Sequence, residues 1–271
     1  MKPRTRAAMA ESIRLVVSEG IARVTLARPE VRNAFNAEVI AQLHDTFTRI
    51  TAADDVRAVV LAGEGKVFCG GADINWMKAS LDLSVDANVA DAERMSGMFR
   101  AIDNCPKPVI GQIQGAALGG GAGLAAVCDI VIASDDAVFG FTEVKLGIIP
   151  AVISPFVIAK IGASHARALF VTGQKFDAHA ALRIGLIHKV VPQVELGAAV
   201  EYALDEIFTA GPAAVSAAKL LVRRVLDNTY DDSLSITARA IALQRTTSEG
   251  QEGLRAFLER RLPSFAKDLE A

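Results

Sequence analysis

Apolar residues along this chain follow strand-like and helix-like patterns in alternation. Residues 13–17 and 21–26 are short β-branched runs on either side of Ser18-Glu-Gly20, a combination that predicts a β-hairpin. Residues 56–61 form a largely apolar run of the kind expected for a strand buried on both faces, and residues 108–114 predict a further buried strand. The first half of the chain is therefore expected to supply a largely buried sheet.

Helical spacing of apolar residues separates these predicted strands. Asn36 is predicted to cap a helix, because its side chain can accept a hydrogen bond from an amide of the first turn. The apolar face of that helix consists of Val39, Ile40, Leu43 and Phe47. Residues 80–104 predict a polar linker and then a helix that carries Met95, Met98, Phe99 and Ile102. We expect its methionines to belong to the core.

The pattern changes near residue 195. Short strands are predicted at 130–133, 138–141 and 186–191, with helices at 155–161 and 165–171 and an Asp177-capped helix that ends at Arg183. Beyond residue 192 only helices are predicted, at 194–209, 212–226, 233–248 and 250–261. This shift predicts an α/β core over residues 1–195 and a helical region over 196–271 that serves packing or subunit assembly.

Composition narrows the class of protein. The 271 residues carry a formal net charge of −2, and 22% of them are charged, so nothing favours a nucleic-acid surface. The three cysteines lie far apart without metal-ligand spacing, which makes a reducing compartment the default. Residues 1–12 lack the apolar centre of a secretory signal, and no apolar run approaches a membrane span. A soluble cytoplasmic protein with no membrane or nucleic-acid partner is expected.

Several common catalytic motifs are absent from the sequence. The glycine cluster after residue 115 does not match a dinucleotide fingerprint, and Gly65-Lys66 is followed by Val67 instead of the Ser or Thr of a phosphate loop. No G-x-S-x-G elbow and no H-E-x-x-H site occur, and the four histidines share no ligand spacing. No metal site is therefore expected.

Two glycine-centred turns carry the candidate chemistry. Five glycines lie between Gly115 and Gly123, after a predicted strand and before an apolar helix. Such a turn directs unpaired helix amides at a ligand, and glycine permits close approach. Residues 68–77 form a second turn of this kind, with Asp73 as the expected cap of a helix beginning near Ile74. Glu143 follows the next apolar run, so the sequence predicts an anion hole beside one acid/base group.

Four segments, taken together, resemble the enoyl-CoA hydratase/isomerase (crotonase) superfamily over nearly the whole chain. They are Phe68-Cys-Gly-Gly-Ala-Asp-Ile74, residues 115–129, residues 139–150 and residues 252–260. Two further stretches, Asp73-Ile-Asn-Trp-Met-Lys78 and residues 143–155, are most similar to bacterial methylglutaconyl-CoA hydratases and their relatives in isoprenoid degradation.

The resemblance implies a fold, a substrate and a set of site residues. It implies a spiral core of repeated ββα units, with C-terminal helices that assemble homotrimers, usually paired into hexamers. It implies an acyl-CoA thioester as substrate, so coenzyme A is part of the substrate and no separate cofactor is expected. The amides of Gly70 and Gly120 would form the oxyanion hole. Further residues implied in substrate binding are Gly71, Ala72, Asp73, Ile74 and Gly123, with Arg32 toward the CoA phosphates and Phe257 and Arg260 toward a neighbouring subunit's site.

The chain departs from the family pattern at Gly123, where two-glutamate hydratases carry their first glutamate. Only Glu143 remains. Three functions stay open: a hydratase that uses Glu143 alone, a Δ3,Δ2-enoyl-CoA isomerase in which Glu143 shuttles a proton, and a non-catalytic acyl-CoA-binding protein.

The missing side chain at Gly123 suggests a hypothesis about the acyl group. We expect it to leave room for a branched or β-carboxylated acyl chain. Residues 151–154 would then form the opposite apolar wall, and Lys145 would meet a distal carboxylate.

Overall fold

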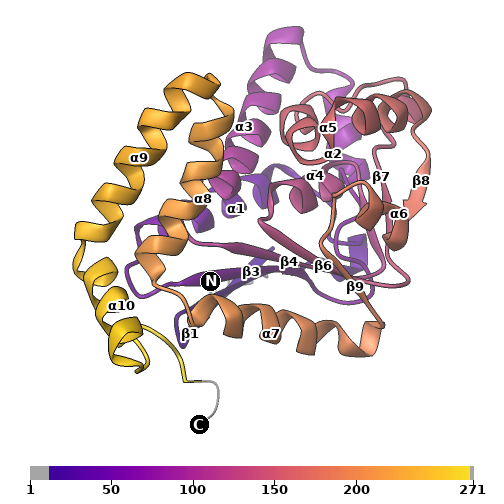
Figure 1. The fold of residues 1–271 in the computed structure, drawn as a ribbon. Coiled ribbons are helices and arrows are strands. Elements are labelled where there is room, and N and C mark those ends of the chain that lie inside the picture. The colour runs from indigo at the N-terminus through magenta and orange to yellow at the C-terminus, as the bar shows by residue number, and fades with distance from the viewer. Residues whose placement is uncertain (1–11, 269–271) are drawn as a thin grey trace, which may run out of the picture.

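A computed structural model describes residues 12–268 as a six-stranded sheet covered by helices on both faces, with a second, three-stranded sheet beside it (Figure 1). The large sheet has the order β1-β2-β3-β4-β6-β9. Its strands are β1 (Ile13–Ser18), β2 (Ile21–Leu26), β3 (Ala58–Gly63), β4 (Val109–Ile113), β6 (Ile130–Ser134) and β9 (Lys189–Val191). Among the strand pairs of this sheet in residues 12–268, only β1–β2 is antiparallel, which confirms the predicted hairpin.

The small sheet connects the two glycine turns to the region around Glu143. Its order is β5 (Ala116–Leu118), β7 (Val138–Gly140) and β8 (Lys175–Asp177). Strand β5 runs parallel to β7, so the residues after Leu118 and after Gly140 emerge at the same edge. The helix α4 (Gly120–Val127) therefore begins beside the turn that carries Glu143, the first residue of the short helix η2 (Glu143–Leu146).

The helices divide between the two faces of the large sheet. The face opposite α7 packs against α1 (Ala37–Ala52), α3 (Val85–Asp103), α4 and α5 (Ser154–Thr172). The other face packs against α7 (Leu196–Phe208), where Val200 and Leu204 meet Val60 and Ile110. Alternate residues of β3 face the two cores, since Val59 and Leu61 lie on the first side. The predicted burial of this strand on both faces is confirmed.

Three helices begin at side chains that accept a hydrogen bond from an amide of the first turn. Asn36 caps α1 by accepting from Val39 N–H at 2.8 Å, and Asp73 caps α2 (Ile74–Ser80) by accepting from Asn75 N–H at 2.8 Å. Asp177 caps α6 (Ala178–Arg183) through Ala180 N–H at 2.7 Å. Two further 3₁₀ turns are η1 (Pro29–Val31) and η3 (Gln193–Glu195). All three predicted caps are confirmed.

Two predicted elements differ in extent. The helices predicted at 155–161 and 165–171 form a single element, α5, with a kink at Gly162, whose φ of 73° only glycine adopts without strain. The strand predicted at 186–191 is shorter, because Leu186 and Ile187 pack into the core ahead of β9 instead of pairing in the sheet.

The last three helices lie along one side of the molecule (Figure 1). They are α8 (Pro212–Leu226), α9 (Tyr230–Thr246) and α10 (Ser248–Glu259). Many of their apolar side chains are exposed, whereas α7 is part of the sheet core. The division of the chain at residue 195 stays a prediction.

Candidate active site

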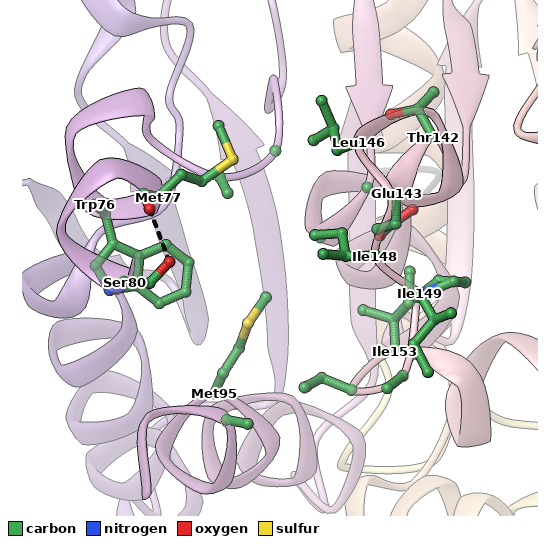
Figure 2. A pocket seen from close by; sticks show the side chains of 18 of the residues that line it. Trp76, Met77, Ser80, Met95, Thr142, Glu143, Leu146, Ile148, Ile149 and Ile153 are labelled. Carbon is green, nitrogen blue, oxygen red and sulfur yellow. Dashed lines mark hydrogen bonds between the residues drawn. The ribbon is translucent and has the colours of Figure 1, made fainter. Parts of the chain in front are cut away.

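A cavity of about 330 Å³ opens between two walls of the α/β region. Figure 2 shows one wall formed by α2 and α3, with Trp76, Met77 and Ser80 of α2 and Met95 of α3. The opposite wall carries Thr142, Glu143, Leu146, Ile148, Ile149 and Ile153. Both glycine turns reach this cavity, through Gly70, Gly71 and Ala72 from the first and Gly119 and Gly120 from the second. The structure thus brings the two predicted turns and Glu143 to one site.

The two glycine turns are held together by backbone contacts. Cys69 pairs with the β5 strand, since its N–H donates to Ala116 C=O at 3.0 Å and its C=O accepts from Leu118 N–H at 3.1 Å. A side chain on Gly121 would collide with Cys69, because its Cβ would lie 2.5 Å from the Cys69 carbonyl oxygen. This close packing explains why glycines are concentrated here, as only bare backbone allows the turns to approach each other.

Each turn has a cavity-lining residue, Ala72 or Gly120, whose backbone amide has no protein acceptor among residues 12–268. Phe35 holds the first turn by donating its N–H to Gly71 C=O at 2.8 Å and accepting from Asp73 N–H at 2.7 Å. Because successive groups of an extended segment point to opposite sides, the Ala72 N–H faces away from Phe35. Gly120 is the first residue of α4, where amides have no intrahelical partner. Within residues 12–268 neither amide donates to a protein group.

The prediction that Gly70 supplies an oxyanion-hole amide is wrong. The Gly70 N–H donates to Arg32 C=O at 2.8 Å, so it is already used in holding the loop before α1. Gly70 still lines the cavity with its backbone. The Ala72 amide, two residues further on, has no protein acceptor among the described residues. The oxyanion-hole role of Gly120 stays a prediction.

Gly120 cannot carry a side chain in this packing. A Cβ there would lie 2.5 Å from Cε2 of Phe35 and 3.1 Å from Cε of Met95. Met95 therefore lines the cavity instead of belonging only to the core as predicted, whereas Met98 is fully buried. Phe35 and Met95 therefore pack directly against the start of α4.

Glu143 is half-buried and points into the cavity (Figure 2). Its carboxylate lies against the start of α4, because a Cβ on Gly119 would be 3.3 Å from Glu143 Oε1. No residue that the structure describes donates a hydrogen bond to Glu143 Oε2. Burial raises the pKa of Glu143, and a hydrogen bond from its own backbone N–H only partly offsets this rise. A carboxyl group in this setting is suited to exchanging protons with a ligand.

The space at Gly123 is filled, which contradicts the expectation of extra room for a branched acyl chain. A Cβ on Gly123 would lie 2.4 Å from Cγ2 of Ile153 and 3.1 Å from Cε1 of Phe99. Gly123 does not itself line the cavity, whereas Ile153 does. The predicted apolar wall at residues 151–154 does exist and is formed by Ala151, Val152 and Ile153.

Other predicted binding residues have structural partners or lie outside the cavity. Asp73 pairs with Arg28 at 3.0 Å and caps α2. Burial would raise the pKa of Asp73, but the hydrogen bonds from Asn75 and Arg28 outweigh it and lower the pKa. Ile74 is largely exposed, and Arg32 is exposed beside Gly70. Lys145 is also exposed and does not line the cavity, so nothing supports its predicted contact with a carboxylate.

Phe257 and Arg260 lie at the end of α10, outside the residues that line the cavity. Phe257 is 81% exposed, and Arg260 adopts a left-handed conformation with φ of 56° as the helix ends. Phe257 and Arg260 therefore do not line the cavity of their own chain. Their role toward a neighbouring subunit stays a prediction.

Several residues of the site were not predicted from the sequence. Trp76, Met77 and Ser80 from α2 and Asn88 and Asp91 from α3 all line the cavity. Trp76 is the single tryptophan of the chain. On α3, the stripe of Phe99 and Met95 continues at helical spacing through Ala92 and Asn88, and this extension is the signal that could have found them.

Asp91 is a second carboxylate in the cavity, but it already has a partner. Its side chain accepts a hydrogen bond from Arg94 at 2.7 Å on the same helix. Within the described part of the chain no group of three or more His, Cys, Asp or Glu side chains could hold a metal ion. No helix in residues 12–268 is long and apolar enough to cross a membrane.

Comparison with known proteins agrees with this architecture. The model of the family "Enoyl-CoA hydratase/isomerase" matches residues 17–268. A Thermus thermophilus protein named "Putative enoyl-CoA hydratase" is 33% identical over 248 residues, which are 90% of this chain and 97% of that protein. The crystal structure of an enoyl-CoA hydratase from Shewanella pealeana gives a TM-score of 0.90 at 35% identity, covering 93% of this chain and 95% of that one. AtuE of Pseudomonas aeruginosa gives a TM-score of 0.92 at 34% identity, covering 95% and 100%.

Fold and sequence together define an enzyme of the crotonase superfamily. The chain belongs to the enoyl-CoA hydratase/isomerase family. The predicted fold class and family are thereby confirmed, and the alternative of a non-catalytic protein is set aside. The finer resemblance to methylglutaconyl-CoA hydratases stays a prediction.

Proposed function

We propose that this protein is an enoyl-CoA hydratase, which adds water across the C2=C3 bond of a 2-enoyl-CoA thioester. The observation that carries the proposal is a half-buried carboxylate, Glu143, packed against the start of the helix whose first amide is free. A thioester oxygen between the Ala72 and Gly120 N–H groups would bring the reacting carbons beside Glu143. The names of the relatives support hydration as the reaction.

The proposed reaction uses one acid/base group. The Glu143 carboxylate accepts a proton from water, and the resulting hydroxide forms a bond to C3. The C2=C3 electron pair moves toward the thioester, and negative charge develops on its oxygen. The Ala72 and Gly120 amides donate to that oxygen, where a prepositioned donor typically lowers the barrier by about 3–4 kcal/mol. Protonated Glu143 then returns its proton to C2, so water has been added and Glu143 is regenerated.

The acyl group proposed for this site is branched or of the methylglutaconyl type. The sequence similarity of residues 73–78 and 143–155 supports it. Since Ile153 fills the space over Gly123, a branch would have to lie in the main cavity between the two walls. Comparing turnover of crotonyl-CoA and 3-methylglutaconyl-CoA tests this, and a clear preference for the straight chain would refute it.

A second candidate is a Δ3,Δ2-enoyl-CoA isomerase. It is favoured by the packing at Gly123, the position of the first glutamate in two-glutamate hydratases. The aliphatic side chain of Ile153 fills this space, where a carboxylate would help to hold a water molecule. In that reaction Glu143 removes a proton from C2 of a 3-enoyl-CoA, the same two amides hold the enolate, and Glu143 returns the proton to C4. One carboxylate suffices for this transfer.

Product mass distinguishes the two reactions. The protein is incubated separately with a 2-enoyl-CoA and with a 3-enoyl-CoA, and the products are identified by mass and retention time. A hydratase adds the mass of water to the 2-enoyl-CoA. An isomerase converts the 3-enoyl-CoA to a product of unchanged mass. No turnover of either substrate would refute both candidates.

We also propose that the C-terminal helices assemble homotrimers, which pair into hexamers. Apolar side chains on α8–α10 support an interface. The most exposed of them are Val222, Leu226, Tyr230, Phe257 and Leu258. Light scattering of the purified protein should give three or six times the 28.6 kDa chain mass, and a monomer at micromolar concentration would refute this assembly.

A further inference from the structure

We propose that Ile153 is the residue that determines which acyl groups this site accepts, because its side chain closes the cavity over Gly123. The inference rests on the proposed function, since it concerns the acyl part of a CoA thioester. The glycine at position 123 does not enlarge the site. The size of residue 153 sets the limit instead.

Residues 123 and 153 compete for one space. A Cβ on Gly123 would lie 2.4 Å from Ile153 Cγ2, closer than real carbon atoms approach, and 3.1 Å from Ile153 Cβ, which is a tight contact. Phe99 closes the remaining side, with Cε1 3.1 Å from the same point. Gly123 therefore accommodates the branched side chain of Ile153, and the two residues act as a matched pair.

The position of Ile153 is fixed by the backbone on either side of it. Ser154 N–H donates to Ala151 C=O at 3.2 Å, and Val157 N–H donates to Ile153 C=O at 3.0 Å, so residue 153 sits at the entry to α5. Its side chain is only 2% exposed, yet it borders the cavity. Because a well-packed core does not rearrange freely, we expect the wall to act as a hard limit.

Ile153 lies on the same wall of the cavity as Glu143 (Figure 2). A substituent on the acyl chain near C3 that points toward this wall would meet the Ile153 side chain. Removing that side chain opens room for it. In an apolar pocket, room for one methyl group changes selectivity by about 10- to 200-fold. The residue should therefore discriminate between acyl groups that differ by a single branch.

The direct experiment compares Ile153→Ala with the matched control Ile161→Ala. Ile161 lies two turns further along the same helix, is 4% exposed and does not line the cavity. Both variants lose the same buried atoms, so both are expected to be less stable. Thermal unfolding first establishes that each variant is folded at the assay temperature.

Binding is measured with butanoyl-CoA and 3-methylbutanoyl-CoA, which are saturated and do not react. Trp76 lines the cavity and supplies a fluorescence signal, with calorimetry as a second readout. In Ile153→Ala the ratio of the two affinities should shift toward the branched ligand by at least about 10-fold. Ile161→Ala should keep the wild-type ratio. An unchanged ratio in folded Ile153→Ala, or an equal shift in both variants, would overturn the proposal.

A second measurement tests the pairing with Gly123 independently of any ligand. Gly123→Ala alone should lower the Tm strongly, because its Cβ collides with Ile153. In the Ile153→Ala background the same substitution should cost much less, giving a favourable coupling in a double-mutant cycle. Additive losses would show that the two residues do not share one space.

The outcomes separate this inference from the proposed function. Wild-type protein that binds both acyl-CoAs but turns over neither 2-enoyl- nor 3-enoyl-CoA would contradict the proposed reaction, while the affinity ratios would still test Ile153. Wild-type protein that hydrates a 2-enoyl-CoA, with unchanged ratios in Ile153→Ala, would contradict only the inference.

Discussion

The two walls of the cavity each carry a carboxylate, and the two differ in their partners. On the α3 wall, Asp91 is paired with Arg94 at 2.7 Å. On the opposite wall, Glu143 Oε2 has no partner among the described residues, and burial raises the pKa of Glu143. The α2–α3 wall supplies shape through Trp76 and Met95, and the Glu143 wall supplies the reacting group.

This comparison shows that a carboxylate in a cavity is not by itself an acid/base group. Asp91 is engaged by Arg94, whereas burial of Glu143 disfavours its charged form and raises its pKa. The unpaired group can therefore take and release a proton at lower cost.

The largest difference is expected between Glu143→Gln and Asp91→Asn. Glu143→Gln removes the group proposed to move the proton, so kcat should fall by about 10²- to 10⁴-fold, while the Kd for butanoyl-CoA changes little. Asp91→Asn should lower kcat less than about 10-fold, since its loss leaves the proton transfer intact. Steady-state kinetics of the two purified variants gives the comparison. Equal losses would mean that the walls share the chemistry.

The second prediction concerns the backbone amide of Ala72. Ala72→Pro removes the free N–H and should lower kcat by about 10²- to 10³-fold, the usual effect of losing one oxyanion-hole donor. Gly70→Ala leaves every amide in place and should have a much smaller effect on kcat, because the Gly70 N–H is bound to Arg32. Circular dichroism and butanoyl-CoA affinity serve as controls for folding. A greater loss in Gly70→Ala would restore Gly70 as the donor.

The third prediction is a pH dependence. Glu143 must be ionised to accept the first proton, and burial raises the pKa of Glu143. The value of kcat/KM should therefore fall as the pH decreases through this raised pKa, at a higher pH than an ordinary glutamate would give. Asp91→Asn should keep the same profile. A profile that is flat down to the usual range of a glutamate would contradict the raised pKa.

The smallest effect is expected on stability. Because the folded-state pKa of Glu143 lies above the unfolded-state value, the stability that this group contributes is present below the unfolded pKa and is lost as the pH rises through the folded pKa. Glu143→Gln removes this loss, so its Tm should exceed that of the wild type by a few degrees at pH 8 and by less at pH 4. A Tm below the wild-type value at pH 8 would show that the carboxylate is stabilised by contacts in the fold.

Much of the fold was predictable because local chemistry determined it. Asn36, Asp73 and Asp177 cap helices at the predicted places. The β1–β2 hairpin follows from the turn residues between its two strands. The sequence also predicted that Glu143 would lie beside the glycine turn that contains Gly120, and both residues line one cavity.

The errors at Gly70 and Gly123 have a different origin. Which amide of a turn is free depends on a partner far along the chain: Arg32 takes the Gly70 N–H, and Phe35 orients Ala72. Likewise the space at Gly123 is decided by Ile153, 30 positions later. Sequence patterns predict the local conformation of a segment. The free amide of the first turn and the filled space at Gly123 depend instead on residues distant in sequence that pack against these segments.

The most direct test of Glu143 as the single acid/base group is deuterium transfer to C2. Crotonyl-CoA is incubated in D₂O with the wild type, Asp91→Asn and Glu143→Gln, and the hydrated product is analysed by mass spectrometry and NMR. We expect the wild type and Asp91→Asn to form product with one deuterium at C2, and Glu143→Gln to form essentially none in the same time. Deuteration at C2 by Glu143→Gln at the wild-type rate would contradict the account.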